Sequence, residues 1–293
     1  MSELELRQRI EACPKLASLR SIHGALADLL RNHHSQAGQF AEIIARDPSL
    51  TSRLLRMVNS VYFGLGTQVG TIEDAVLYLG LRQIRSLALA TPVLEDMSAM
   101  GADGPQVSWR DFWLHTLACA FATRDLLNYS DVTIDDDTDY ITGLLQNVGK
   151  VVIAKVFPAE FAQLTQSVYE NEAQVLAAER ALLGWDHAAI GAYYLENHKI
   201  PAEIVEVVRF HHDPLQAPAR KHLAAATHLA DGYARLAGLS GGVELRPAPT
   251  EDELIATPSA ALLWGDDLAA RTAQMRPLAD SMRRLPALVN ALL

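Results

Sequence analysis

The chain has 293 residues, 49% of them hydrophobic, which is enough apolar side chain for one large domain or two ordinary ones. Its net charge of −10 argues against a general nucleic-acid binder, because the phosphate backbone would repel it. The start, Met1-Ser2-Glu3-Leu4, lacks a signal-peptide pattern, and no apolar run approaches the roughly 18 to 20 residues that span a bilayer. Cys13 and Cys119 provide neither a disulfide framework nor metal-knuckle spacing. We therefore expect a cytoplasmic protein that does not enter a membrane.

Helix signals dominate the first part of the chain, up to residue 98. Asp47-Pro48 predicts a helix start, with Asp as the N-cap and Pro at the first helical position, and this helix should stop near Asn59. Thr71, with Asp74 three residues on, predicts a second start, and Gly80 ends that helix. The apolar stripe from Leu81 to Leu94 predicts a third helix.

A turn-prone segment, residues 99–107, forms the clearest linker in the chain. Beyond it we expect further helices, and a loop follows them from Gly238 to Thr250. Helices are predicted near residues 109–128, 139–149, 159–168, 172–182, 187–197, 201–212 and 219–238. Ala and Leu dominate, and no alternating apolar run predicts a sheet, so the expected fold class is all-α. The predicted division is 1–98, linker 99–107, 108–239, and a C-terminal helical extension over 240–293.

The most informative motif is the segment Ile141 to Lys150, ITGLLQNVGK. It has the shape of a buried helix ending at Gly149, with a lysine just beyond. It resembles the GLLHDIGK signature of the HD superfamily of metal-dependent phosphohydrolases, in which a His-Asp dyad supplies two metal ligands. Here Gln146 and Asn147 occupy the dyad positions. An amide offers a cation only a weak carbonyl oxygen and no charge.

Other motifs, in the same order along the chain, make the resemblance more specific. They are Asp47-Pro48-Ser49-Leu50, Arg53-Leu54-Leu55-Arg56, Val58-Asn59-Ser60, Tyr62-Phe63-Gly64, Ile72-Glu73-Asp74-Ala75, Leu79-Gly80-Leu81, Phe112-Trp113-Leu114-His115, Trp185-Asp186-His187, Gly191, Ile200-Pro201 and His211-His212. Together they are similar to the HDOD domain, the HD-related output domain of bacterial signalling proteins, over roughly residues 13 to 235. The resemblance implies a two-lobed helical domain whose second lobe is similar to the HD fold. It also implies a non-catalytic regulator.

The resemblance places a vestigial HD pocket in the second lobe. Its residues would be His115, Gln146, Asn147, Lys150, His187, His211, His212 and Asp231. By this resemblance His115 matches the first ligand of HD enzymes and Asp231 the last, while the three other histidines match additional histidines of the larger HD-GYP relatives. With one histidine and one carboxylate left, a hydrolytic metal would be held too weakly to activate water.

Two interpretations of this pocket stay open. A different metal could be held by the histidines with Asp231, since imidazoles suit zinc or iron. Alternatively, the histidines are hydrogen-bonded packing residues with Gln146 and Asn147 as neutral partners. Lys150 either faces a phosphate or complements the dipole at a helix C-terminus, and we favour the second. We therefore assign no metal, cofactor or catalytic residue.

Two arginine pairs predict a basic patch on the first lobe. Arg53 with Arg56 and Arg82 with Arg85 are spaced by three residues on neighbouring helices, and could receive an acidic partner, a nucleotide or DNA. Solvated helix faces or internal salt bridges explain the same spacing without a partner.

The expected function is a non-enzymatic signalling module that binds another protein. We find no receiver, GGDEF, EAL or kinase segment, so that signalling partner is expected in trans. The alternatives are a degenerate HD protein that senses a metal or nucleotide, and a residual phosphohydrolase. The partner, the signal, the oligomeric state and the role of residues 240–293 are not encoded in any pattern we recognise.

Overall fold

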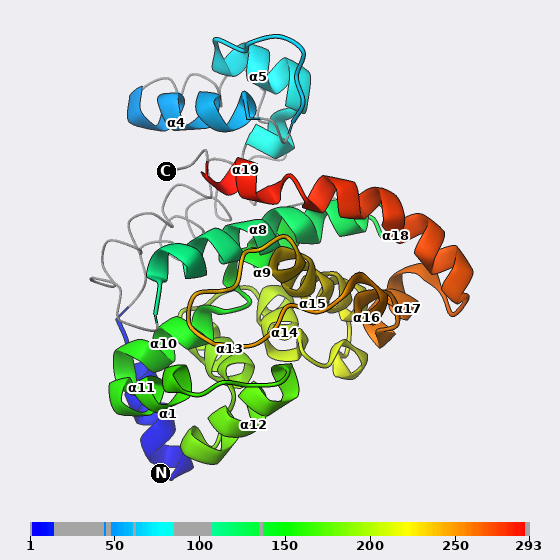
Figure 1. The fold of residues 1–293 in the computed structure, drawn as a ribbon. Helices are drawn as coiled ribbons and strands as arrows, with labels where there is room; N and C mark the ends of the chain where they lie inside the picture. The colour runs from blue at the N-terminus through cyan, green and yellow to red at the C-terminus, as the bar shows by residue number, and fades with distance from the viewer. Residues whose placement is uncertain are drawn as a thin grey trace. The chain divides into compact units, whose positions relative to one another are not determined.

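A computed structural model describes residues 2–14, 44, 48–60, 63–84, 107–134 and 137–290. These residues are helical apart from the turns and loops between helices, and they contain no strand (Figure 1). An isolated parallel bridge joins Val168 to Leu245. The expected all-α fold class is confirmed.

The chain divides into two compact units, each described by itself. The larger unit comprises Met1–Pro14 and Ala102–Met282, and the smaller unit comprises Lys15–Gly101 and Arg283–Leu293. These units differ from the predicted lobes at both ends, because the first 14 residues group with the larger unit and the last 11 with the smaller one. The predicted linker over residues 99–107 lies outside the described residues, except for residue 107.

Helices α4 (Pro48–Val58) and α5 (Ile72–Leu79) pack together in the smaller unit, which also contains α19 (Leu285–Asn290). Helix α4 begins at the predicted proline. The side chain of Thr71 caps α5 by accepting from the Asp74 backbone N–H at 3.1 Å. Asn59 binds the loop between these helices, accepting from the Val69 N–H and donating to its carbonyl. Of the helix predicted from Leu81 to Leu94, residues 81–84 are described and are helical.

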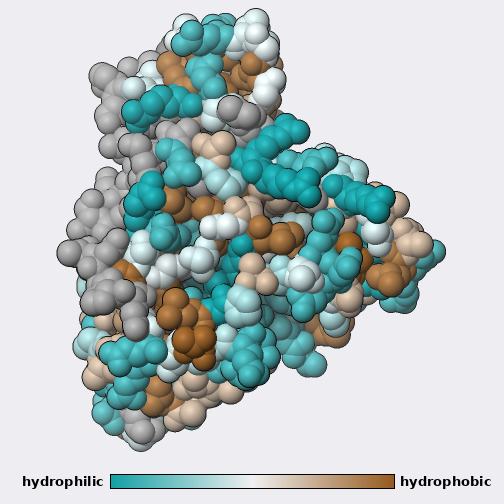
Figure 2. Space-filling view, viewed as in Figure 1, coloured by the Kyte–Doolittle hydropathy of each residue, from teal (hydrophilic) through white to brown (hydrophobic). Residues whose placement is uncertain are grey.

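Thirteen helical segments build the described part of the larger unit. They are α1 (Glu3–Glu11), α8 (Trp109–Asn128), α9 (Thr138–Leu145), α10 (Val148–Val156), α11 (Pro158–Gln166), α12 (Glu172–Leu183), α13 (His187–Asn197), α14 (Ala202–Phe210), a short 3-10 helix (Pro214–Gln216), α15 (Lys221–Leu236), α16 (Glu251–Ile255), α17 (Pro258–Trp264) and α18 (Leu268–Met282). Within the described part of the chain, no helix combines the length and apolarity needed to cross a membrane. On the face shown in Figure 2, hydrophobic side chains form small separate groups among hydrophilic ones.

Helix α8 forms the centre of the larger unit. It is buried along nearly its whole length, between α9 and α15 (Figure 1). Ser108 starts it by accepting from the Asp111 backbone N–H at 3.2 Å. Because α8 is covered on several sides, its polar residues face other protein groups instead of water, and His115 is one of them.

The predicted helix 139–149 is wrong at its end. Helix α9 ends at Leu145, Gln146 and Asn147 form a turn, and α10 begins at Val148. This turn lets α9 pack against α8 while α10 packs against α13. A Cβ on Gly149 would lie 1.9 Å from the carbonyl oxygen of His187, so only glycine permits the approach of α10 and α13. Gly149 is therefore a packing residue inside a helix and does not terminate one.

Candidate functional site

His115 lies on α8 with both ring nitrogens occupied. Its Nε2 is 2.8 Å from Oδ1 of Asp231, and its Nδ1 is 2.8 Å from the carbonyl oxygen of Leu239. The buried Cys119 sulfur lies 3.4 Å from the same Nε2. A carbonyl oxygen only accepts, so Nδ1 must donate to it. The contact of Nε2 with Asp231 is a second polar contact of the same ring, so neither nitrogen is without a partner.

Asp231 on α15 is held by three side chains. Besides His115, Arg235 donates from Nε to Oδ2 at 3.1 Å, and Arg246 donates from Nη2 to the same oxygen at 2.7 Å. Burial opposes ionisation of this carboxyl, but Arg235 and His115 outweigh it and hold the pKa of Asp231 well below its usual range. Asp231 is therefore a carboxylate whose charge is already compensated by protein groups.

A second buried carboxylate, Glu244, extends this network. It accepts from Lys150 Nζ at 2.5 Å and from Arg246 Nε at 3.1 Å, and it also pairs with Arg235. Burial raises the pKa of Glu244, but Lys150 and the two arginines outweigh it and bring that pKa far below its usual range. Lys150 lies in the first turn of α10, so its predicted role at a helix C-terminus is wrong. Its ammonium pairs with Glu244 instead.

These contacts show whether a divalent metal could bind, as in HD enzymes, at the positions that the motif predicted. His115 and Asp231 survive, but each is bound to the other, and Asp231 also binds two guanidinium groups. A metal there would need Nε2 without its proton and a carboxylate free of the arginines. At the two dyad positions, Gln146 and Asn147 supply amides in place of an imidazole and a carboxylate. The residues present do not fit an HD metal centre.

The two amides themselves are buried. Both side-chain polar atoms of Gln146, and Nδ2 of Asn147, have no hydrogen-bond partner among the described residues. Gln146 lies beside the Cys119 thiol without reaching hydrogen-bond geometry. Gln146 is therefore not the neutral partner of a histidine that the sequence led us to expect.

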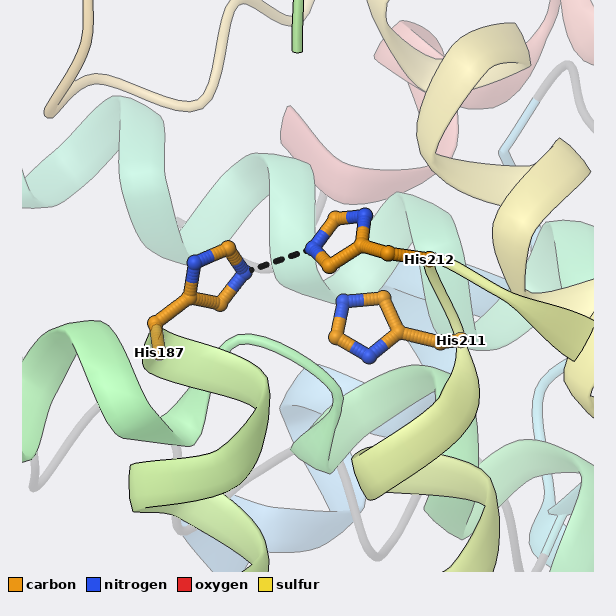
Figure 3. Close-up of side chains that lie close together, drawn as sticks. All are labelled: His187, His211 and His212. Atoms are coloured by element: carbon orange, nitrogen blue, oxygen red, sulfur yellow. Dashed lines mark hydrogen bonds between the residues drawn. The ribbon is translucent and has the colours of Figure 1, made fainter. Parts of the chain in front are cut away.

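The other three histidines form a separate cluster at the start of α13 and the end of α14 (Figure 3). His187 is the first residue of α13, and Asp186 caps that helix by accepting from the Ala189 N–H at 2.9 Å. His187 Nε2 is 2.9 Å from His212 Nε2, so one of these nitrogens donates and the other accepts. Helix α14 ends at Phe210, earlier than predicted, which places His211 and His212 just beyond it.

Acceptor oxygens face the Nδ1 atoms of this histidine cluster, which we define as His187, His211 and His212. Glu179 lies 2.8 Å from Nδ1 of His187, and the Val208 carbonyl lies 2.7 Å from Nδ1 of His211. Glu172 Oε2 is 3.0 Å from Nδ1 of His212, an ion-pair contact whose angle falls outside hydrogen-bond geometry.

The two neighbouring imidazoles at the end of α14 differ in their electrostatics. Burial lowers the pKa of His212, but the Glu172 carboxylate outweighs this and raises it. Burial, together with His212 and His187, brings the pKa of His211 well below its usual range. His211 is therefore neutral at pH 7, and because its Nδ1 donates to a carbonyl, its Nε2 carries the lone pair.

Several site residues were missed from the sequence. They are Glu172, Glu179, Arg235, Glu244 and Arg246. For Glu244 and Arg246, the sequence signal was Gly242 in the loop predicted from Gly238 to Thr250. A Cβ on Gly242 would lie 2.1 Å from the Ser108 carbonyl, and Ser108 N–H donates to the Gly242 carbonyl at 2.7 Å. This close approach fixes the loop against α8, and Glu244 and Arg246 follow directly.

The predicted arginine patch is described only in part. Arg56 is exposed on α4, and Arg82 is half-buried in the short helical segment after Gly80. The side chain of Arg53 and all of Arg85 lie outside the described residues. Arg56 lines an open groove of about 770 Å³ in the smaller unit, together with Thr51, Leu55 and Asn59. The patch stays a prediction.

Comparison with solved structures shows where this fold occurs. An HDOD domain protein of unknown function from Geobacter sulfurreducens matches with a TM-score of 0.78 and 24% identity, covering 99% of this chain and 98% of that one. A protein from Shewanella amazonensis SB2B, provisionally named a phosphohydrolase, matches with a TM-score of 0.66 and 24% identity, covering 98% of each chain. At these identities the likeness concerns the fold.

Sequence comparison gives the family. An uncharacterized protein of Treponema pallidum (strain Nichols) is 28% identical over 217 residues, which is 73% of this chain. The chain spans about 40% of the length of that relative. The family model of the HDOD domain matches residues 16–214, more than half of the chain. The chain therefore belongs to the HDOD domain family.

Proposed function

We propose that this protein is a non-catalytic regulatory module of bacterial signalling, which acts by binding a partner protein in trans. One observation carries the non-catalytic part. Asp231, the last carboxylate of an HD centre, is bound by Arg235 and Arg246 in a buried network. These guanidinium groups supply the positive charge that a metal would otherwise supply.

Metal-dependent hydrolysis requires an ion that lowers the pKa of a bound water, which means several protein ligands and an open position. Here a metal would have to displace two buried arginines from Asp231. Removing one partner of a buried ion pair costs about 3–5 kcal/mol, because the other charge is left uncompensated. The amide oxygens of Gln146 and Asn147 are weak metal ligands and do not offset this free-energy cost.

For the partner, the described surface favours the groove on the smaller unit. Arg56 is exposed there on a chain whose net charge is −10, so an acidic segment of a signalling protein would find a local cation in this groove. Family membership supports a signalling context.

Hydrolysis assays test the non-catalytic part. The purified chain would be incubated with Mn²⁺, Mg²⁺ or Fe²⁺ and with a cyclic dinucleotide, a nucleoside monophosphate or a generic phosphodiester. We expect no turnover above that of the His115→Ala variant. Turnover that disappears in His115→Ala would establish a residual phosphohydrolase and overturn the proposal.

Affinity capture from the native cytoplasm, followed by a binding titration with the recovered protein, tests the partner. Arg56→Glu should weaken that binding at least ~10-fold and abolish its salt dependence, since the reversed charge repels an acidic segment. Arg209→Glu, on α14 in the larger unit, is the matched charge reversal and should have no effect. Equal losses in both variants would contradict the assignment to this groove.

A further inference from the structure

We infer that the histidine cluster, His187, His211 and His212, is a binding site for one divalent transition metal of the zinc class. It is separate from the HD dyad, which does not fit a metal. The inference goes beyond the proposed regulatory function, and it does not depend on whether a partner binds the smaller unit.

The geometry of the three rings comes first. One ligand nitrogen from each ring lies within 4.8 Å of the other two, and the Nε2 atoms of His187 and His212 are 2.9 Å apart. Figure 3 shows the second nitrogen of His211 directed toward the space between the other two rings. Zinc bonds of about 2.0–2.1 Å at tetrahedral angles place ligand nitrogens about 3.3 Å apart. The nitrogen–nitrogen distances in the cluster, from 2.9 Å up to 4.8 Å, include this value, so small side-chain rotations suffice to bring all three nitrogens to one metal ion.

The outer side of the cluster is organised as a metal site requires. Ligating histidines donate their other ring N–H to a carboxylate or carbonyl, which fixes the tautomer and leaves the opposite nitrogen free for the metal. Glu179 and the Val208 carbonyl hold these positions behind His187 and His211, and Glu172 Oε2 lies 3.0 Å from Nδ1 of His212 as an ion-pair contact. All three Nε2 lone pairs can therefore face one point.

A packing role explains the cluster less well. His211 is 1% exposed, yet its Nε2 has no hydrogen-bond partner within the described residues. A buried acceptor without a partner costs about 1–3 kcal/mol. A metal at the centre would bind this nitrogen and replace the contact between two Nε2 atoms, which satisfies only one lone pair.

Charge also favours a divalent cation. Glu172 and Glu179 contact the cluster from two sides, and both are carboxylates, although Glu172 also pairs with Arg246. Three imidazoles without a thiolate suit zinc, nickel, copper or iron better than magnesium or calcium. The side chain of His212 is 10% exposed and that of Glu172 24%, which provides a route from solvent.

The site is connected to the Asp231 network. Glu172 Oε2 contacts His212, while its Oε1 accepts from Arg246 at 3.1 Å, and Arg246 donates to Asp231. Metal binding that repositions His212 therefore acts on the residue that ties loop 238–250 to α15. This gives occupancy a route to a structural change in the larger unit.

Isothermal titration of the full-length chain, stripped of metal with a chelator, tests the inference with Zn²⁺ and then Co²⁺. We expect about one equivalent per chain, with a tetrahedral Co²⁺ absorption spectrum. His211→Ala should lower zinc affinity by more than ~100-fold, and Glu179→Gln by ~10–100-fold. His198→Ala, a histidine of the same unit outside the cluster, is the matched control and should bind zinc like the parent. Far-UV circular dichroism identifies any variant that fails to fold, and Glu179→Gln then serves in place of His211→Ala.

Two results would overturn the inference. One is the absence of stoichiometric Zn²⁺ and Co²⁺ binding by the folded parent chain. The other is zinc binding that persists in His211→Ala and Glu179→Gln but is lost in Cys119→Ala, since His115, Cys119 and Asp231 form the other group of ligand-type atoms. Hydrolysis by the metal-loaded chain would overturn the proposed non-catalytic function and leave the metal site intact, so the two failures are distinguishable.

Discussion

Arg246 donates a hydrogen bond from Nη2 to Oδ2 of Asp231 at 2.7 Å, and both side chains are buried. The resemblance to HD enzymes predicts Asp231 as the last metal ligand, whereas Arg246 comes from the loop between α15 and α16. A guanidinium is a permanent cation that cannot activate water. The pair therefore keeps the carboxylate ionised and removes it from metal chemistry.

We expect Arg246→Ala to destabilise the protein by about 3–5 kcal/mol, because Asp231, Glu244 and Glu172 each lose a cationic partner in a buried network. Urea denaturation measures the change. Arg209→Ala removes an exposed ion pair with Glu196 and should cost ~1 kcal/mol or less. Equal effects of the two substitutions would show that the buried network contributes little.

Restoring the dyad should not restore hydrolysis. In the double variant Gln146→His, Asn147→Asp, the missing ligand types return, but Asp231 is still bound by Arg235 and Arg246. We expect no Mn²⁺-dependent cleavage of a generic phosphodiester. The parent chain is the control, and cleavage by the double variant alone would mean that the arginines yield to a metal.

Gly149→Ala should cost at least ~3 kcal/mol or prevent folding, since its Cβ would lie 1.9 Å from the His187 carbonyl and force α10 and α13 apart. Thermal denaturation checks this. The control is Gly70→Ala, where an added Cβ meets nothing within 4 Å. A Gly149→Ala variant as stable as that control would contradict the close approach of the two helices.

Acid should destabilise the larger unit through its buried carboxylates. The pKa values of Asp231 and Glu244 are lowered in the folded state, so the unfolded chain binds protons first as pH falls. Their stabilising contribution is therefore complete above about pH 5 and is lost progressively below the unfolded-state pKa values of ~4. Urea midpoints measured from pH 7 to pH 3 should follow this course.

The Asp231→Asn variant is the comparison for the acid experiment. It should be less stable than the parent at pH 7, and its stability should fall less steeply below pH 5, because one titrating group is absent. A parallel decline in both proteins would assign acid sensitivity to other carboxyl groups.

Helices with strong local signals were predictable from the sequence. The proline at 48 and the threonine at 71 start helices where caps predict them, and α13 spans the predicted residues 187–197. Local rules failed at Gln146 and Asn147. Apolar residues continue at helical spacing through the turn, so the sequence pattern could not show that two helices begin to pack on different neighbours there.

The all-α class, the family resemblance and the loss of the His-Asp dyad could be read from residue types and their local spacing. What stands in place of the dyad became clear from the packing of the folded chain. Arg246 and Glu244, in one loop, meet Asp231 on α15 and Lys150 on α10, and His187 meets His212 from another pair of elements. Such contacts depend on how buried helix faces pack, and a charged side chain in a loop is indistinguishable by sequence from one that faces solvent.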